Sequence, residues 1–163
     1  MSMNDSLLIR PIKTKDKDWL LTLLRAQFGS EQVALRGKIV NAFDFPGFVA
    51  CLEGENVGVV IYENQSESIE IIALVSIRPK QGVGATLISR IKDEAKKQGK
   101  KQITVITTND NTHALRFYQK HGFVLTRIFA NSVVALRVLK PEIPKLGNDG
   151  IPIRDEIELQ IAL

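Results

Sequence analysis

The sequence contains very little cysteine and histidine. Cys51 is the single cysteine, and only 2 histidines occur among 163 residues. One thiol cannot close an internal disulfide bond, and one cysteine with two histidines cannot supply the usual ligands of a structural zinc site. These absences exclude an extracellular disulfide-rich scaffold, and we expect an intracellular protein that binds no metal.

Long apolar runs are missing as well. Nowhere do about 18 apolar residues follow one another, which is the length that a membrane-spanning helix needs. The opening residues 1–13 contain no apolar stretch of the kind found in signal peptides. We therefore expect a cytoplasmic protein without a membrane partner.

Aromatic residues make up only 6% of the chain, and the excess of positive charge is small. Lysine and arginine number 22 against 18 aspartates and glutamates, which gives a net charge of +4. A nucleic-acid-binding surface would combine interleaved aromatic residues with a basic stripe, and neither is present. The charge allows an anionic partner, but we expect no nucleic acid.

The apolar residues that are present suffice for one core. Hydrophobic residues make up 44% of the 163 residues, and a domain of this size buries roughly 70% of the surface that its unfolded chain exposes. No repeat, low-complexity tract or linker divides the sequence. We expect a single domain over residues 1–163.

The first half of the chain combines helical and strand patterns. Residues 7–12 favour a short strand, and residues 19–28 repeat apolar positions at helical spacing until Gly29. Residues 30–45, with apolar residues scattered among charges, favour a second short helix. Three further apolar runs, separated by turn residues, predict an antiparallel meander over 48–52, 57–62 and 69–77.

The second half begins with a strand, a helix and a strand. Residues 85–97 carry an apolar helical face, and the β-branched residues 103–107 predict the next strand. Together with strand 69–77 they form a βαβ unit, whose strands should be parallel with a right-handed crossover. A short helix over 112–120 follows. Alternating apolar residues predict a final strand over 151–163, which either completes the sheet of its own chain or pairs across a dimer.

Two glycines stand at the start of helix 85–97, in a segment that runs from Arg78 to Thr86. Consecutive N–H groups at a helix N-terminus can bind phosphate oxygens, and Arg78 and Lys80 add positive charge. Such a loop can also simply turn the chain. It is neither a Walker loop, which needs Gly-Lys-Ser/Thr, nor a dinucleotide fingerprint, since Leu87 stands where a third small residue belongs.

A second group of polar and aromatic residues lies in segment 111–123. Asn111 opens the predicted helix, and Tyr118 follows two helical turns later on the same face. Both residues can therefore face one cleft. Each also has a purely structural interpretation, Asn111 as a helix cap and Tyr118 as a half-buried core aromatic.

Together these segments resemble the GNAT superfamily of N-acetyltransferases. The family hallmark is a loop Gln/Arg-x-x-Gly-x-Gly/Ala before a helix, followed by Asn-x-x-Ala-x-x-x-Tyr-x-Lys-x-Gly-Phe. The resemblance covers about residues 7–130, including an opening Ile9-Arg10-Pro11. Pro79 occupies the usual Gln/Arg position and lacks an N–H, so that either Arg78 or Gln81 would replace it or the loop is one residue shorter than usual. The second pattern matches at all of its positions. The matching residues are Asn111, Ala114, Tyr118, Lys120, Gly122 and Phe123.

The resemblance implies an α/β fold of the α+β type. The family has a mixed, mainly antiparallel sheet of about six to seven strands flanked by about four helices, splayed at the strands that bind the cofactor. The motif-bearing core would cover about residues 7–130, and the strand segment 151–163 would follow it.

The resemblance also implies an acetyl-CoA-dependent N-acetyltransferase, in which a primary amine attacks directly in a ternary complex. Tyr118 would protonate the departing thiolate, and Asn111 would hold the cofactor. Main-chain N–H groups near Leu74 and Val75 would face the pantetheine and the thioester carbonyl. Arg116 is a further candidate for the phosphates. The loop residues expected to bind acetyl-CoA are Arg78, Lys80, Gln81, Gly82, Val83, Gly84, Ala85 and Thr86.

An alkyl amine is almost fully protonated at neutral pH, so a base must remove a proton before attack. Glu70, in the strand before the loop, is our candidate, directly or through water. It could equally be an exposed strand residue, and Glu53, Glu63 and Glu67 are alternatives nearby in the sequence.

The acceptor is the partner that the sequence identifies least. We expect a small-molecule amine, and the alternatives are a peptide or protein amine or a non-catalytic acyl-CoA-binding regulatory module. The expected partners are thus acetyl-CoA and an amine, and a homodimer is a further possibility.

Overall fold

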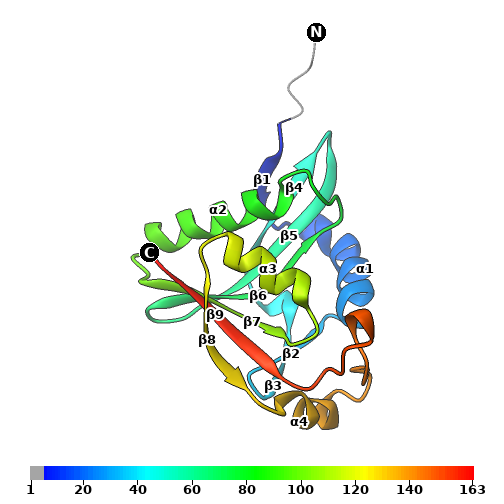
Figure 1. Ribbon diagram of the computed structural model, residues 1–163. Helices are drawn as coiled ribbons and strands as arrows, with labels where there is room; N and C mark the ends of the chain where they lie inside the picture. The colour runs from blue at the N-terminus through cyan, green and yellow to red at the C-terminus, as the bar shows by residue number, and fades with distance from the viewer. Residues whose placement is uncertain (1–5) are drawn as a thin grey trace.

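The computed structural model describes residues 6–163 and shows a mixed sheet with helices packed on both faces (Figure 1). The sheet has seven strands in the order β1-β4-β5-β6-β7-β9-β8. These strands are β1 (Leu8–Pro11), β4 (Gly47–Leu52), β5 (Glu55–Asn64), β6 (Ser68–Ser76), β7 (Gln102–Thr108), β8 (Val124–Phe129) and β9 (Glu156–Ala162). The helices are α1 (Lys17–Phe28), α2 (Val83–Lys97), α3 (Thr112–Lys120) and α4 (Ser132–Leu139).

Alternation along the strands creates one core on each face of the sheet. In β4, Phe48 and Ala50 belong to the core that includes residues of α2 and α3, whereas Val49 belongs to the core on α1. The apolar face expected for α2 is confirmed, because its four residues are each at most 1% exposed. Burial of each leucine or isoleucine contributes roughly 1.5–3 kcal/mol. The four residues are Leu87, Ile88, Ile91 and Ala95.

The expected βαβ unit is confirmed, but its strands pair over only part of their length. β6 and β7 are parallel, with register pairs from Ser68 opposite Gln102 to Ile71 opposite Val105. Both strands continue beyond these pairs, and Ile72 forms a bulge against β5 at the same point. The main-chain groups that face the gap beyond residues 71 and 105 therefore have no strand partner. This is the splay that the family resemblance implies.

The prediction of a helix within residues 30–45 is wrong. The segment forms a hairpin of β2 (Gln32–Leu35) and β3 (Lys38–Asn41), followed by a short 3₁₀ turn, Ala42–Asp44. Positive φ angles of 51° at Arg36 and 76° at Gly37 make the two-residue turn that suits a hairpin. Val33 and Leu35 are buried with a period of two, but the strand has only four residues, too few for the alternation to stand out in the sequence.

The final strand is shorter than expected and lies inside the sheet. β9 begins at Glu156, and residues 151–155 belong to the preceding link rather than to a strand. β9 pairs antiparallel with β7 on one side and with β8 on the other. The alternative in which the terminal strand completes its own sheet is confirmed, and β9 has no free edge.

No helix within residues 6–163 is both long enough and apolar enough to cross a membrane.

Candidate active site

The loop before α2 leaves several main-chain N–H groups free. Lys80 and Gly82 have positive φ angles of 63° and 74°, and Gly82 is the residue before the first helical turn. The first helical hydrogen bond runs from Thr86 N to Gly82 O, at 3.0 Å. The N–H groups of Gly84 and Ala85 therefore have no main-chain acceptor within the described residues. A Cβ atom added at Gly82 would meet nothing within 4 Å, so the space over the loop is open.

Gly84 allows α2 to begin close to α3. A Cβ atom at this position would lie 3.0 Å from both Cε2 and Cζ of Phe117. Val83 points the other way, into the core, and is buried. The loop is thus fixed on one side by α3 and on the other by the sheet.

The positive charge expected at the loop is partly engaged elsewhere. Arg78 Nη2 lies 2.7 Å from Oε2 of Glu55, the first residue of β5, and Arg78 Nη1 lies 4.0 Å from Glu53 in the turn before it. Lys80 and Arg116 are exposed. Neither side chain forms an ion pair within residues 6–163.

Asn111 and Tyr118 both adopt the structural positions that the sequence allowed. Asn111 Oδ1 accepts a hydrogen bond of 3.1 Å from Ala114 N and so caps α3. The ring of Tyr118 packs edge-on against Phe117 and Phe123, with centroid distances of 5.3 Å in each case. Burial raises the pKa of Tyr118 above its ordinary value, so that its hydroxyl is a weaker acid than that of an exposed tyrosine.

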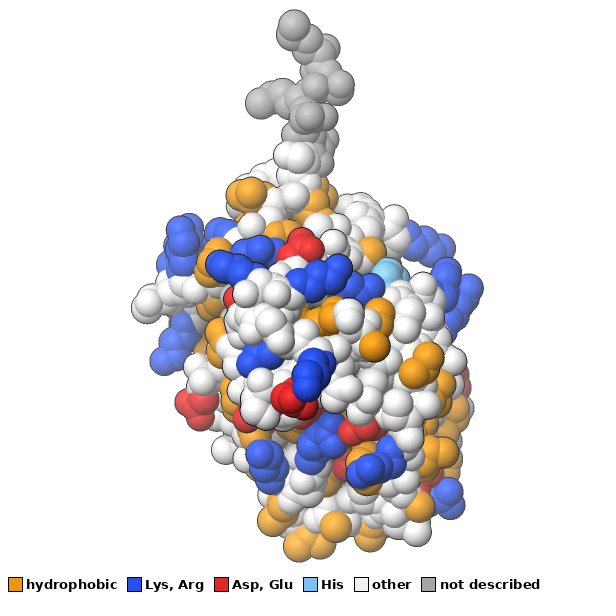
Figure 2. Space-filling view, turned by 90° about the vertical axis from the view of Figure 1, so that its left-hand side faces the viewer, with side chains coloured by type: hydrophobic (Ala, Val, Ile, Leu, Met, Phe, Trp, Pro, Cys, Tyr) orange, Lys and Arg blue, Asp and Glu red, His pale blue; other side chains and the backbone are white. Residues whose placement is uncertain are grey.

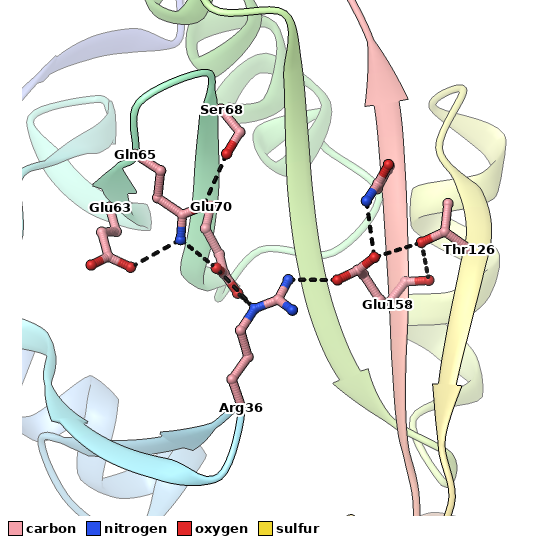
Figure 3. Close-up of polar contacts among 8 residues, drawn as sticks. Arg36, Glu63, Gln65, Ser68, Glu70, Thr126 and Glu158 are labelled. Carbon is pink, nitrogen blue, oxygen red and sulfur yellow. Dashed lines mark hydrogen bonds and ion pairs between the residues drawn. The ribbon is translucent and has the colours of Figure 1, made fainter.

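Glu70 is buried, contrary to the interpretation of an exposed strand residue, and it is firmly held (Figure 3). Arg36 Nε donates to both carboxylate oxygens, at 2.8 and 3.0 Å. Gln65 Nε2 donates to Oε2 at 2.9 Å. Both oxygens of Glu70 are therefore already engaged by hydrogen bonds.

Arg36 links the β2–β3 hairpin to two strands of the main sheet. Its Nη2 donates to Glu158 Oε2 at 2.7 Å, across β7 from Glu70. Burial raises the pKa of Glu158, but hydrogen bonds from Arg36 and Thr126 outweigh it and hold that pKa below its ordinary value. The guanidinium thus compensates two buried carboxylates at once.

Replacement of Arg36 by methionine is expected to cost about 2–4 kcal/mol of the free energy of unfolding, because Glu70 and Glu158 lose their common counter-charge. Urea unfolding at neutral pH measures the loss. The control is Lys101→Met, which removes an ion pair of 2.6 Å between side chains that are 72% and 66% exposed. If the Arg36 variant lost no more than the Lys101 variant, the linking role of Arg36 would be wrong.

A cavity of about 610 Å³ lies on the α1 face of the sheet, beside the gap between β6 and β7. It is bounded by the end of α1, the β2–β3 hairpin, α4 and the link before β9. Ile72 contributes from β6 and residues 106–108 from β7, so the cavity reaches the unpaired ends of both strands. Asn111 and Glu156 line it as well, whereas Glu70 does not.

Sequence reasoning missed Arg36, Glu156 and Glu158. The partners of Arg36 lie 34 and 122 residues away, so no local pattern connects them. The alternation of β9 could have placed Glu156 and Glu158 on one face, opposite Ile157 and Leu159. That signal was available, but nothing in the sequence indicated that both faces of the strand are buried.

The comparisons with known proteins agree with this geometry. The family model described as "Acetyltransferase (GNAT) family" matches residues 17–123. The chain belongs to this family, and the expected class, an acetyl-CoA-dependent acetyltransferase of the GNAT type, is confirmed.

Two Bacillus subtilis (strain 168) proteins are similar over nearly their whole length. YxbD is 39% identical over 145 residues, which cover 88% of this chain and 91% of YxbD. YdhI is 36% identical over 152 residues, which cover 93% of this chain and 95% of YdhI. Both are described as uncharacterized.

The fold has solved counterparts. A GNAT family acetyltransferase from Elizabethkingia anophelis, with acetyl-CoA bound, matches with a TM-score of 0.71 at 24% identity. The match covers 98% of this chain and 100% of that one. The expected mixed, mainly antiparallel fold is confirmed.

Proposed function

We propose that the protein transfers the acetyl group of acetyl-CoA to the primary amine of a small molecule, by direct attack in a ternary complex. The observation that carries the proposal is the gap between β6 and β7. The open glycine loop lies at one end of this gap, and the cavity of about 610 Å³ opens beside it. One domain therefore offers space for a donor and for an acceptor.

The loop residues fit a phosphate-bearing donor. Free N–H groups at Gly84 and Ala85, the positive end of the α2 dipole and the open space over Gly82 suit phosphate oxygens. Gln81 and Thr86 flank these groups, and Lys80 supplies charge. The Elizabethkingia protein of the same fold binds acetyl-CoA, which supports this assignment.

The unpaired stretch of β6 suits the acyl end of the donor. Acetyl-CoA supplies an activated thioester carbonyl. β6 is hydrogen-bonded to β5 on one side, with Leu74 opposite Val60 and Val75 opposite Val59, and its other edge faces the gap. N–H groups on that edge would donate to the carbonyl oxygen as negative charge develops on it. Loss of one such donor typically costs roughly 3 kcal/mol of barrier.

Tyr118 is the proposed proton donor, because it occupies the tyrosine position of the family pattern, seven residues after Asn111. The amine enters as R–NH₃⁺ and first loses one proton to a base. Its nitrogen then forms a bond to the carbonyl carbon while the carbon–sulfur bond breaks. Tyr118 gives its proton to the sulfur and recovers one from the nitrogen, so the net products are the amide, CoA and one proton.

The role of Glu70 as the base stays a prediction, but the geometry does not favour it. Its oxygens are held by Arg36 and Gln65, and it does not line the cavity. Asn111 is proposed to act on the donor through its side-chain N–H₂, because its oxygen caps α3.

The shape of the cavity favours a small molecule over a peptide. The β2–β3 hairpin, α4 and the link before β9 bound it, and its volume lies within the range of small-ligand sites. A peptide or protein amine and a non-catalytic acyl-CoA-binding module remain the competing functions. Release of free CoA in the presence of small amines separates the first proposal from both.

A homodimer also remains a proposal, but the terminal strand cannot supply its sheet edge. β9 is internal, so the exposed edge at this end of the sheet is β8. Its Val124, Leu125 and Ile128 are 60%, 46% and 66% exposed. Hydrophobic side chains are mixed with lysine and arginine on this side of the molecule and gather toward the lower end, where α4 lies (Figure 2).

Thermal unfolding of the full chain with and without acetyl-CoA tests donor binding. At about 100 times its Kd, a ligand adds roughly 2.7 kcal/mol, which raises the Tm of a domain of this size by several degrees. A panel of small amines, followed by release of free CoA, then tests transfer. Absence of any shift with acetyl-CoA would contradict the proposed function.

A further inference from the structure

Glu156 is a buried carboxylate that has no ion pair. It is 2% exposed and lines the cavity beside the β6–β7 gap. Its buried neighbours Glu70 and Glu158 share Arg36, but no ion pair within residues 6–163 includes Glu156. A buried charge without a counter-charge is costly, so it is usually matched by a ligand or by neutralisation.

The strand register places Glu156 at the end of β7 where the gap opens. Glu156 lies opposite Thr108 of β7, three residues beyond Val105, the last β7 residue that pairs with β6. Side chains directly opposite each other in adjacent strands lie on the same face of a sheet. Thr108 and Glu156 both line the cavity, so the carboxylate belongs to the face on which an acceptor would approach the gap.

The other buried charges around the cavity are already engaged. Lys140 Nζ donates to Phe28 O and Gln32 O, each at 2.7 Å, which ties α4 to α1 and the hairpin. Asp110 accepts hydrogen bonds from Thr108 Oγ1 at 2.6 Å and from the Asn148 side chain at 2.9 Å. These hydrogen bonds hold Lys140 and Asp110 in place, although Asp110, like Glu156, has no ion pair within residues 6–163.

Part of the cavity wall is apolar, and it lies beside polar side chains such as Arg25, Asp110, Asn111 and Glu142. Apolar side chains from α1, the hairpin, β6 and α4 contribute, namely Phe28, Val33, Leu35, Ile72, Val133 and Leu136. A cavity in which a buried carboxylate without an ion pair shares the wall with apolar side chains is complementary to a cation that carries an apolar body.

We propose that Glu156 binds the ammonium group of the acceptor and takes its first proton, and that the acceptor is a small monoamine with an apolar body. This inference rests on the proposed function. R–NH₃⁺ and the Glu156 carboxylate become R–NH₂ and a neutral carboxylic acid. The amine lone pair is then free to attack, and the acid later returns its proton to solvent.

Burial raises the pKa of Glu156, and hydrogen bonding to Ser132 and to the main chain of Arg36, together with the Arg36 charge, opposes that rise only in part. A base with a raised pKa is better matched to an ammonium group than an ordinary glutamate. As the pH falls through that pKa, the carboxylate is protonated and kcat/KM for the amine should fall. The other charged groups around Glu156 and the cavity are Arg25, Arg36, Glu70, Asp110, Lys140, Glu142 and Glu158.

Calorimetric titration of the full-length protein in the presence of CoA tests the binding step. The probes are phenethylamine and the neutral phenethyl alcohol, which share an apolar body. The wild type is expected to bind the amine about tenfold or more tightly than the alcohol. Glu156→Gln should lose this preference and leave the affinity for the alcohol unchanged. Equal binding of both probes by the wild type would overturn the proposal without any variant.

Turnover tests the proton-accepting step. Glu156→Gln is expected to lower kcat/KM for the amine about a hundredfold and to remove the fall of kcat/KM at low pH. The KM for acetyl-CoA should stay within about twofold. The control is Asp93→Asn, which removes an exposed carboxylate of α2 that does not line the cavity and should leave all values unchanged.

A folded Glu156→Gln variant with wild-type kinetics and pH profile would overturn the proposal while the proposed function stands. If the wild type turned over no amine at all, the proposed function would fail. The comparison of amine and alcohol binding would still decide the role of Glu156. Glu156→Asp, which keeps the charge, should recover part of the preference for the amine even if the glutamine variant folds poorly.

Discussion

Replacement of Gly84 by valine is expected to weaken acetyl-CoA binding by more than about 100-fold. A Cβ atom at this position would already lie 3.0 Å from two ring atoms of Phe117, and the γ-methyl groups of valine need still more space. The start of α2 must therefore move away from α3. That movement displaces the free N–H groups of Gly84 and Ala85, which we propose bind the phosphates.

The series Gly84, Gly84→Ala and Gly84→Val should show a graded loss of affinity in calorimetric titrations with acetyl-CoA. Alanine adds only the Cβ atom, so a small shift of the Phe117 ring can accommodate it. Thermal unfolding shows whether each variant is folded. A folded Gly84→Val protein with unchanged affinity would contradict the assignment of the loop as the phosphate site.

Replacement of Tyr118 by phenylalanine is expected to lower kcat about a hundredfold while the Kd for acetyl-CoA stays within about twofold. The change removes only the hydroxyl, and that group donates to no side chain or main-chain acceptor within the described residues. The packing of the ring on Phe117 and Phe123 is retained. Steady-state kinetics and calorimetry together separate the loss of proton donation from a loss of packing.

Tyr62→Phe is the matched control, because Tyr62 is also a buried tyrosine of the same core and stacks on Phe48, away from α3. Its kcat should equal that of the wild type. Equal losses of kcat and of affinity in the Tyr118 variant would show that the residue packs rather than reacts. An unchanged kcat would remove it from the mechanism.

The sequence predicted most of the elements that carry the donor site, because their signals are local. The apolar face of α2, the β-branched strand β7 and the glycines at residues 82 and 84 each follow from neighbouring residues. The parallel pairing of β6 and β7 then follows from the order of strand, helix and strand. The gap begins beside the bulge at Ile72, and no residue type in this part of the sequence predicts a bulge.

The β2–β3 hairpin and the buried carboxylates of β9 could not be predicted in the same way. Arg36 occupies a left-handed turn position where glycine or asparagine is more usual, and its role depends on two distant carboxylates. Glu156 and Glu158 alternate with apolar residues, a pattern that normally marks a solvated face. Both are buried, because the hairpin and α4 cover that face of the sheet as well.

The most direct test of the account is the stoichiometry of acetyl transfer by the full-length protein. Acetyl-CoA carrying a labelled acetyl group is incubated with phenethylamine, and mass spectrometry follows the labelled amide while a thiol reagent follows free CoA. We expect one labelled amide for each CoA released, at a rate well above the uncatalysed reaction. CoA release without amide, or no release beyond the uncatalysed rate with any small amine, would contradict it.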